Sequence, residues 1–137
     1  MTSKTVLALI VATPSSLQNA LMALMTTFSQ ISAVMVAEEA NLALRMVKDH
    51  HPALIVIDVD FPESQTLLKQ MKTQWPRARC ILLVNSFEQK EDVTDADAVL
   101  IKGFPVEKLN GTIEELLAQR ENDIKVKSNS EGGTDAD

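Results

Sequence analysis

The sequence of 137 residues has few of the residues that mark several functional classes. Its one cysteine, Cys80, cannot form an internal disulfide, so we expect a reducing, cytoplasmic location rather than a secreted scaffold. Only Gly103 and Gly111 precede the C-terminal segment, which excludes the glycine-rich phosphate loops of common nucleotide-binding motifs. Lys and Arg total 13 against 19 Asp and Glu, and the net charge of −6 argues against a nucleic-acid partner.

Acidic residues are missing from the first part of the chain. Between Met1 and Ala37 the only ionisable side chain is Lys4, and all 19 acidic residues follow this segment. The apolar run Val6–Ala12 is short for the hydrophobic part of a signal peptide, so we interpret it as a buried strand. No apolar run approaches the length of about 18 residues that a spanning helix needs, and no membrane contact is expected.

Short continuous apolar runs predict strands that are covered on both faces. Four such runs are Val6–Ala12, Ala53–Ile57, Ile81–Val84 and Val99–Ile101. A fifth run, Ile31–Ala37, includes Ser32 and suits a strand nearer the edge of a sheet.

Between these runs, apolar residues recur every three or four positions, which is typical of helices with one buried face. The first helix is predicted to have Thr13 as its N-cap and Pro14 at its first position. The strict alternation predicts an α/β fold, a single domain with a doubly wound five-stranded parallel sheet. In such sheets, ligands bind beyond the carboxyl ends of the strands. We place the domain at residues 1–124 and expect a disordered tail at 125–137, which has a single large apolar residue.

Polar residues follow three of the predicted strands. Asp58 ends one strand, Asn85 and Ser86 follow the next, and Lys102 follows the last. The segments Leu9–Pro14, Pro52–Pro62 and Ala96–Phe104 resemble the receiver domain of bacterial response regulators, which has a CheY-like, flavodoxin-like fold. The resemblance extends from Lys4 to Ala118, and its most specific part is an apolar strand that ends in Asp and is followed four residues later by Pro.

The resemblance assigns roles to the residues at the strand ends. In the family, an aspartate at the place of Asp58 accepts a phosphoryl group from a sensor histidine kinase. The lysine at the place of Lys102 binds the phosphoryl oxygens. The position of the family's hydroxyl residue falls on Asn85, whose amide can donate to an oxyanion, or on Ser86 in an alternative register.

The family's magnesium-binding acidic pair is replaced in this sequence. Its two positions fall on Val11 and Ala12, or on Ala12 and Thr13. Magnesium prefers carboxylate and other hard oxygen ligands, and none of these three residues has a carboxylate. We therefore expect no metal and no other cofactor. If a magnesium ion is bound, Asp58 and Asp60 are the candidate ligands.

Three further departures concern the segment around Lys102. The sequence has fewer residues between Asn85 and Lys102 than the family usually has, by about one helical turn, so we expect a short fourth helix. The proline that usually follows the lysine is Gly103, and the usual aromatic residue three positions before the lysine is Val99.

These observations predict a degenerate receiver, or pseudo-receiver, that is not an enzyme. It would act in two-component signalling by contact with a protein, such as a sensor histidine kinase or a downstream effector, with weak or no magnesium-dependent phosphorylation. One alternative is a working response regulator that is phosphorylated on Asp58 with Mg²⁺ bound. Another is a flavodoxin-like module that binds a small molecule. A homodimer is a further alternative, and the sequence does not identify the partner.

Overall fold

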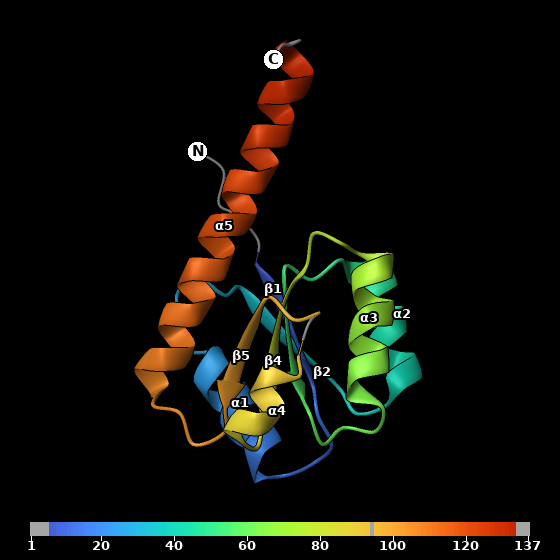
Figure 1. The fold of residues 1–137 in the computed structure, drawn as a ribbon, viewed down its shortest axis with the longest axis vertical. Coiled ribbons are helices and arrows are strands. Elements are labelled where there is room, and N and C mark those ends of the chain that lie inside the picture. Colours follow the sequence, from blue (N-terminus) through green and yellow to red (C-terminus); the bar gives the residue numbers. More distant parts are fainter. Residues whose placement is uncertain (1–5, 94, 134–137) are drawn as a thin grey trace.

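In the computed structural model of the chain, residues 6–93 and 95–133 are described, with side chains through Arg120. Strands and helices alternate along these residues (Figure 1). The strands are β1 (Leu7–Val11), β2 (Ala33–Ala37), β3 (Leu54–Asp58), β4 (Arg79–Val84) and β5 (Ala98–Ile101). The helices are α1 (Ser16–Met25), α2 (Ala40–His50), α3 (Ser64–Gln74), α4 (Phe87–Glu91) and α5 (Val106–Gly133).

The described strands form one parallel sheet in the order β2-β1-β3-β4-β5. Val11 pairs with Ile57, and Asp58 at the end of β3 pairs with Leu83 of β4. The chain passes from one side of β1 to the other between β2 and β3, so the order of strands reverses between β1 and β3. The predicted five-stranded, doubly wound parallel sheet is confirmed.

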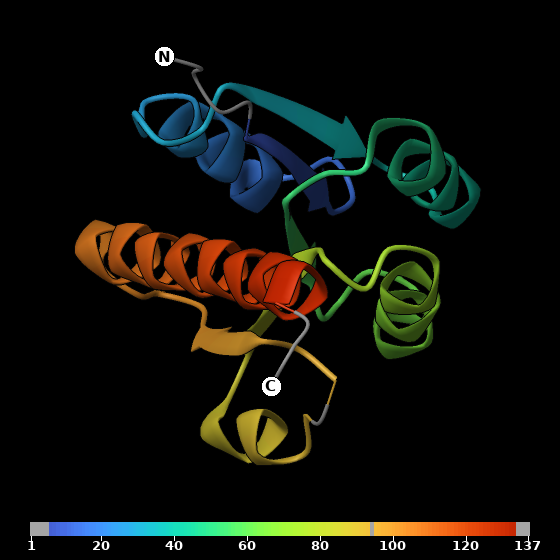
Figure 2. The ribbon, with the colours of Figure 1, turned by 90° about the horizontal axis from the view of Figure 1, so that it is seen from above.

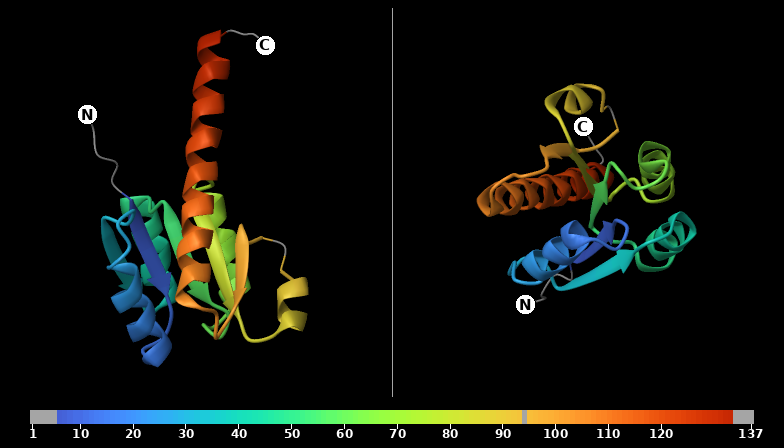
Figure 3. Two further views of the ribbon diagram at one scale, coloured as in Figure 1. Left: turned by 90° about the vertical axis from the view of Figure 1, so that its left-hand side faces the viewer. Right: turned by 90° about the horizontal axis from the view of Figure 1, so that it is seen from below.

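Helices cover both faces of this sheet (Figures 2 and 3). Successive side chains of a strand point to opposite faces, so each strand contributes to two apolar clusters. One cluster joins Ile10 and Val56 to α1 and α5, and the other joins Leu9 and Ile55 to α2 and α3. Because the strands are buried on both faces, their sequences are continuously apolar, and the described residues form a single α/β domain.

The fourth helix is short, as predicted. α4 has five residues, none of them buried, and lies beside β5 at the edge of the sheet. Its N-cap is Ser86, whose side chain accepts a hydrogen bond from the backbone N–H of Gln89 at 3.2 Å. A single turn with such a cap has little apolar surface to bury, so α4 contributes little to the core.

The predicted start of α1 is wrong by two residues. The N-cap is Ser15 and not Thr13, and Pro14 precedes the helix. Ser15 Oγ accepts from the backbone N–H of Gln18 at 3.2 Å and donates to the carbonyl of Thr13 at 3.1 Å. Residues 13–15 therefore form a turn that carries the chain from β1 into α1 before the helix begins.

The last helix is longer than the sequence pattern predicted. α5 has 28 residues, so it includes residues 125–133 of the expected disordered tail, and the predicted boundary at residue 124 falls within it. Residues 134–137 of that tail lie outside the described residues. This part of α5 lacks proline, and extending an existing helix costs less than starting one. The helix projects beyond the amino-terminal edge of the sheet (Figures 1 and 3). Within the described residues, no helix is both long and apolar enough to span a membrane.

Candidate functional site

Three neighbouring strands bring the candidate residues to one edge of the sheet. Asp58 is the last residue of β3, Asn85 follows β4, and Lys102 follows β5. The backbone N–H of Lys102 donates to the carbonyl of Val84 at 2.8 Å, which continues the pairing of β4 and β5. Because β4 lies between them, β3 and β5 are two strand spacings apart, about 10 Å. A long side chain such as lysine is therefore needed to reach Asp58 from β5.

Asp58 and Lys102, the two residues to which the resemblance assigns phosphoryl chemistry, form an ion pair. Lys102 Nζ lies 2.6 Å from Asp58 Oδ1. The same oxygen accepts the backbone N–H of Asp60 at 2.9 Å. Asp58 is only 7% exposed. A buried carboxylate is costly unless donors compensate it, so these two contacts offset the cost of burying the Asp58 side chain.

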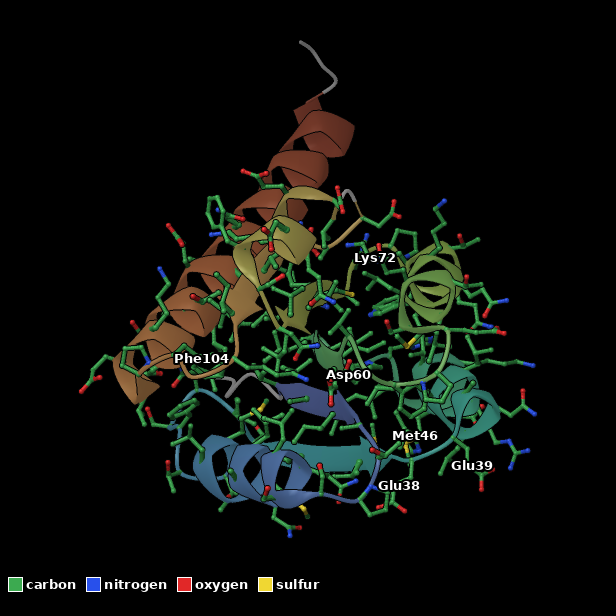
Figure 4. The ribbon with its side chains drawn as sticks, turned by 60° about the horizontal axis from the view of Figure 1, so that its bottom comes forward. Glu38, Glu39, Met46, Asp60, Lys72 and Phe104 are labelled. Atoms are coloured by element: carbon green, nitrogen blue, oxygen red, sulfur yellow. The ribbon has the colours of Figure 1, made fainter. Side chains whose placement is uncertain are left out.

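Asp60 adds a second carboxylate to this pair. Lys102 Nζ donates to Asp60 Oδ2 at 2.8 Å, and Asn85 Nδ2 lies 3.0 and 3.2 Å from the two oxygens of Asp60. The Asp60 side chain is 62% exposed and lies at the carboxyl edge of the sheet (Figure 4). The sequence reasoning considered Asp60 only as a metal ligand and missed its contact with Lys102. One ammonium thus bridges two carboxylates.

These contacts shift two of the protonation equilibria. The hydrogen bond from Lys102, and then the one from Asn85, lower the pKa of Asp60 below its ordinary value. Partial burial of Lys102 by itself lowers its pKa, but the hydrogen bonds to Asp58 and Asp60 outweigh burial, so the pKa of Lys102 is raised. Both shifts favour the charged forms, which keep the cluster together at neutral pH.

The second candidate donor after β4 does not join this cluster. Ser86 Oγ caps the first turn of α4, where it accepts from Gln89. Asn85 is the residue whose side chain faces Asp60, and its backbone N–H donates to Gln89 Oε1 at 2.6 Å. Of the two alternatives from the sequence, Asn85 is therefore the one that lies at the site.

The turn after Lys102 depends on a glycine. Gly103 has a φ of +95°, a backbone conformation that side chains with a Cβ rarely adopt. The glycine that replaces the family's proline at this position therefore fits the turn. It leads through Phe104 and Pro105 into α5.

The end of β1 lacks the ligands that a magnesium ion needs. Val11 and Ala12 are fully buried, and Thr13 offers only a neutral hydroxyl. The side-chain amide of Gln18 donates to the carbonyl of Ala12 and to Glu38 Oε2, both at 2.9 Å. Glu38 lies near the start of α2 (Figure 4).

The carboxylates at the end of β3 do not offer a free set of ligands either. Asp58 and Asp60 both face the ammonium of Lys102, which a divalent cation would repel. Within residues 6–93 and 95–133, no group of three or more His, Cys, Asp or Glu side chains is placed to hold a metal ion. The donor set of this edge does not fit magnesium, which requires about six oxygen ligands in octahedral geometry.

Comparison with known proteins relates this fold to receiver domains. The sequence matches no family model and no curated protein. The structure is similar to the signal receiver domain of an HD domain-containing protein from Pseudomonas fluorescens Pf-5, with a TM-score of 0.79, 17% identity, and coverage of 91% of this chain and 96% of that one. A CheY-like receiver domain protein from Methanospirillum hungatei JF-1 gives a TM-score of 0.76 and 20% identity. The match covers 88% of this chain and 99% of that one.

A longer protein gives a similar result. NtrX from Brucella abortus matches with a TM-score of 0.83 and 16% identity over 98% of this chain, which spans 31% of that protein. At these identities the likeness establishes the fold. The chain has the fold of CheY-like response regulator receiver domains, with a short α4.

Proposed function

We propose that this chain is a receiver-like module of two-component signalling that acts by protein contact and depends little or not at all on magnesium-dependent phosphorylation. It is not itself an enzyme. Its partner is a protein, either a sensor histidine kinase or a downstream effector, and the single buried cysteine fits a cytoplasmic location. The fold supports the receiver part of this proposal, and the altered carboxyl edge supports the rest.

One observation carries the proposal: Lys102 bridges Asp58 and Asp60 at 2.6 and 2.8 Å. A phosphoryl group on Asp58 would carry about two negative charges in place of the single charge of the carboxylate, and beside Asp60 it would need cations to compensate them. The only cation in contact with this pair, among the described residues, is already shared by both carboxylates. Phosphorylation of Asp58 is therefore disfavoured by electrostatic repulsion.

A working phospho-acceptor is the second candidate, because Asp58 and Lys102 lie in direct contact. Asn85 also provides a donor at the same edge. Under this reading, phosphorylation would require Lys102 to release Asp60, and Asp58 and Asp60 would hold a weak metal site. Both functions use the same residues, so a covalent readout on Asp58 decides between them.

The side of the sheet at β5 supports a function in protein contact. A groove of about 480 Å³ lies along β5 and is lined in part by Lys90, Phe104 and Lys108. Phe87 of the neighbouring α4 is 61% exposed. Lysines around an apolar floor fit an acidic and partly apolar segment of another protein. A second copy of the chain is an alternative occupant of this face.

The test is phosphorylation by a small phosphodonor. The wild-type chain and Asp58→Asn are incubated with acetyl phosphate and Mg²⁺, and intact masses are measured over time. We expect no stoichiometric phosphate adduct on either protein, because Lys102 is shared and the end of β1 supplies no carboxylate.

A positive control makes this result interpretable. A receiver domain with an intact acidic pair, treated in the same way, must form the adduct. A stoichiometric adduct on the wild-type chain that is absent from Asp58→Asn would refute the proposal and establish the phospho-acceptor instead.

A further inference from the structure

Two hydrogen-bond donors from different strand ends converge on one group. Lys102 Nζ, after β5, and Asn85 Nδ2, after β4, both donate to the carboxylate of Asp60, at 2.8 Å and at 3.0 and 3.2 Å. An ammonium and an amide that point to the same place form a binding position for an anion with several oxygens. Here the anion belongs to the chain itself.

The backbone directs Asp60 back over the site. Its N–H donates to Asp58 Oδ1 at 2.9 Å, which fixes the turn that follows β3. This turn places the carboxylate of Asp60 on the solvent side of Asp58, with 62% of the Asp60 side chain exposed. A tethered carboxylate has a high effective concentration at the two donors, so it competes well with free anions.

The geometry points to an oxyanion-binding position, formed by Lys102 Nζ and Asn85 Nδ2, that the carboxylate of Asp60 occupies as a built-in ligand. Asp60 is thus a positioning residue, which holds Lys102 and Asn85 in the arrangement that a bound oxyanion would impose. This inference deepens the proposed function and rests on it, because it names what occupies the site in place of a phosphoryl group. Removing Asp60 should open the position to a small inorganic oxyanion such as phosphate.

Asp58 and Asp60 make different contributions to this occupancy. Of the two side-chain donors, Asp58 contacts Lys102 and not Asn85, whereas Asp60 contacts both. Phosphate binding should therefore depend on residue 60 more than on residue 58. Asp58 would only weaken binding, because its charge repels the anion across the shared ammonium.

The experiment titrates inorganic phosphate, at constant ionic strength, into four full-length proteins: wild type, Asp58→Asn, Asp60→Ala and the double variant. The readouts are the NMR signal of the Asn85 side-chain amide and the thermal midpoint. We expect the double variant to bind phosphate most tightly and Asp60→Ala more weakly. Wild type and Asp58→Asn should bind at least about tenfold more weakly than the double variant.

Three controls tie the result to this position. Asp49→Ala removes an exposed aspartate on α2 and should bind as wild type does. Lys102→Met in the double variant should abolish binding. Circular dichroism verifies folding, and if an alanine variant does not fold, Asp60→Asn replaces it and should give the same order of affinities.

Two results would overturn the inference. One is phosphate binding by Asp58→Asn that equals binding by the double variant, and the other is no binding by the folded double variant. No phosphodonor is present, so either result is independent of an adduct on the wild-type chain, which would refute the proposed function instead.

Discussion

Two charged clusters lie at opposite edges of the same sheet and are built differently. The carboxyl-edge cluster is formed by Asp58, Asp60, Asn85 and Lys102, with one cation and two carboxylates. The amino-edge cluster lies at the start of β4 and β5 and has the opposite balance. There, Asp97 pairs with Lys72 at 2.9 Å and with Arg79 at 3.5 Å.

The clusters also differ in their contacts with the main chain. Asp97 Oδ2 accepts the backbone N–H of Cys80 at 2.8 Å, and Lys72 Nζ donates to the carbonyl of Ala78 at 2.7 Å. At the carboxyl edge, Asp60 meets Lys102 and Asn85 through side chains alone. The amino-edge cluster therefore stabilises the strand ends, whereas the carboxylate of Asp60 at the carboxyl edge can exchange partners without breaking a backbone hydrogen bond. Three predictions test this difference.

The largest effect is expected at the amino edge. Asp97→Ala removes the acceptor of the Cys80 N–H, and it also removes the carboxylate that pairs with Lys72 and Arg79. We expect the free energy of unfolding to fall by about 2 kcal/mol. Urea unfolding followed by the fluorescence of Trp75 measures this change.

The control for this prediction is a second loop aspartate. Asp95 precedes β5 and makes no hydrogen bond or ion pair with the other described residues. Asp95→Ala should change the free energy of unfolding by less than about 0.5 kcal/mol. Equal losses in both variants would contradict the special role of the amino-edge cluster.

An intermediate effect is expected for Lys102→Met. The variant leaves Asp58, which is 7% exposed, and Asp60 without their shared cation. We expect a loss of about 1 to 2 kcal/mol at neutral pH, because water screens part of the charge. A double-mutant cycle measures the coupling of Lys102 to Asp58.

In the Asp58→Asn background, Lys102→Met should cost less than half as much, because the buried charge is gone. Equal costs in both backgrounds would mean that Lys102 stabilises the fold by packing of its stem rather than by the ion pair.

The smallest effect concerns pH. The folded-state pKa of Asp60 is lowered from 3.8, so its contribution to stability is present above this value and is lost as the pH falls below it. Asp60→Asn should therefore be less stable than wild type at pH 6, by less than about 1 kcal/mol, and equal to it near pH 2. Chemical denaturation across this range measures the difference. A difference in stability between the two proteins that persists at pH 2 would show that it does not arise from the charge of Asp60.

The contribution of Lys102 to stability depends on pH in the opposite direction to that of Asp60. The pKa of Lys102 is raised above 10.5, so its contribution is present below that value and is lost only as the pH rises through the folded-state pKa.

Much of the fold could be predicted because its signals are local. Ala53–Ile57 is apolar without interruption, which indicates a strand covered on both faces, and Asp58 ends it. Parallel strands bring their carboxyl ends to one edge, so the meeting of Asp58 and Lys102 followed from the order of elements. The short α4 followed from counting residues between Asn85 and Lys102.

The remaining features depend on side-chain conformations and on the ends of helices. The contact of Asp60 with Asn85 requires the turn after β3, which the N–H of Asp60 fixes on Asp58. Ser15 rather than Thr13 caps α1 because of a turn that propensity does not specify. The end of α5 was missed because polar residues without proline are compatible with either a tail or a continued helix.

The length of α5 turns a small change in its angle into a large displacement of its far end. The helix begins at Val106, four residues after Lys102, and its 28 residues rise about 42 Å, more than twice the length of a five-residue strand. By simple geometry, a tilt of about 5° at its first turn moves the far end by about 4 Å. A protein bound at the far end would therefore detect a change of angle that is too small to notice at the carboxyl edge itself.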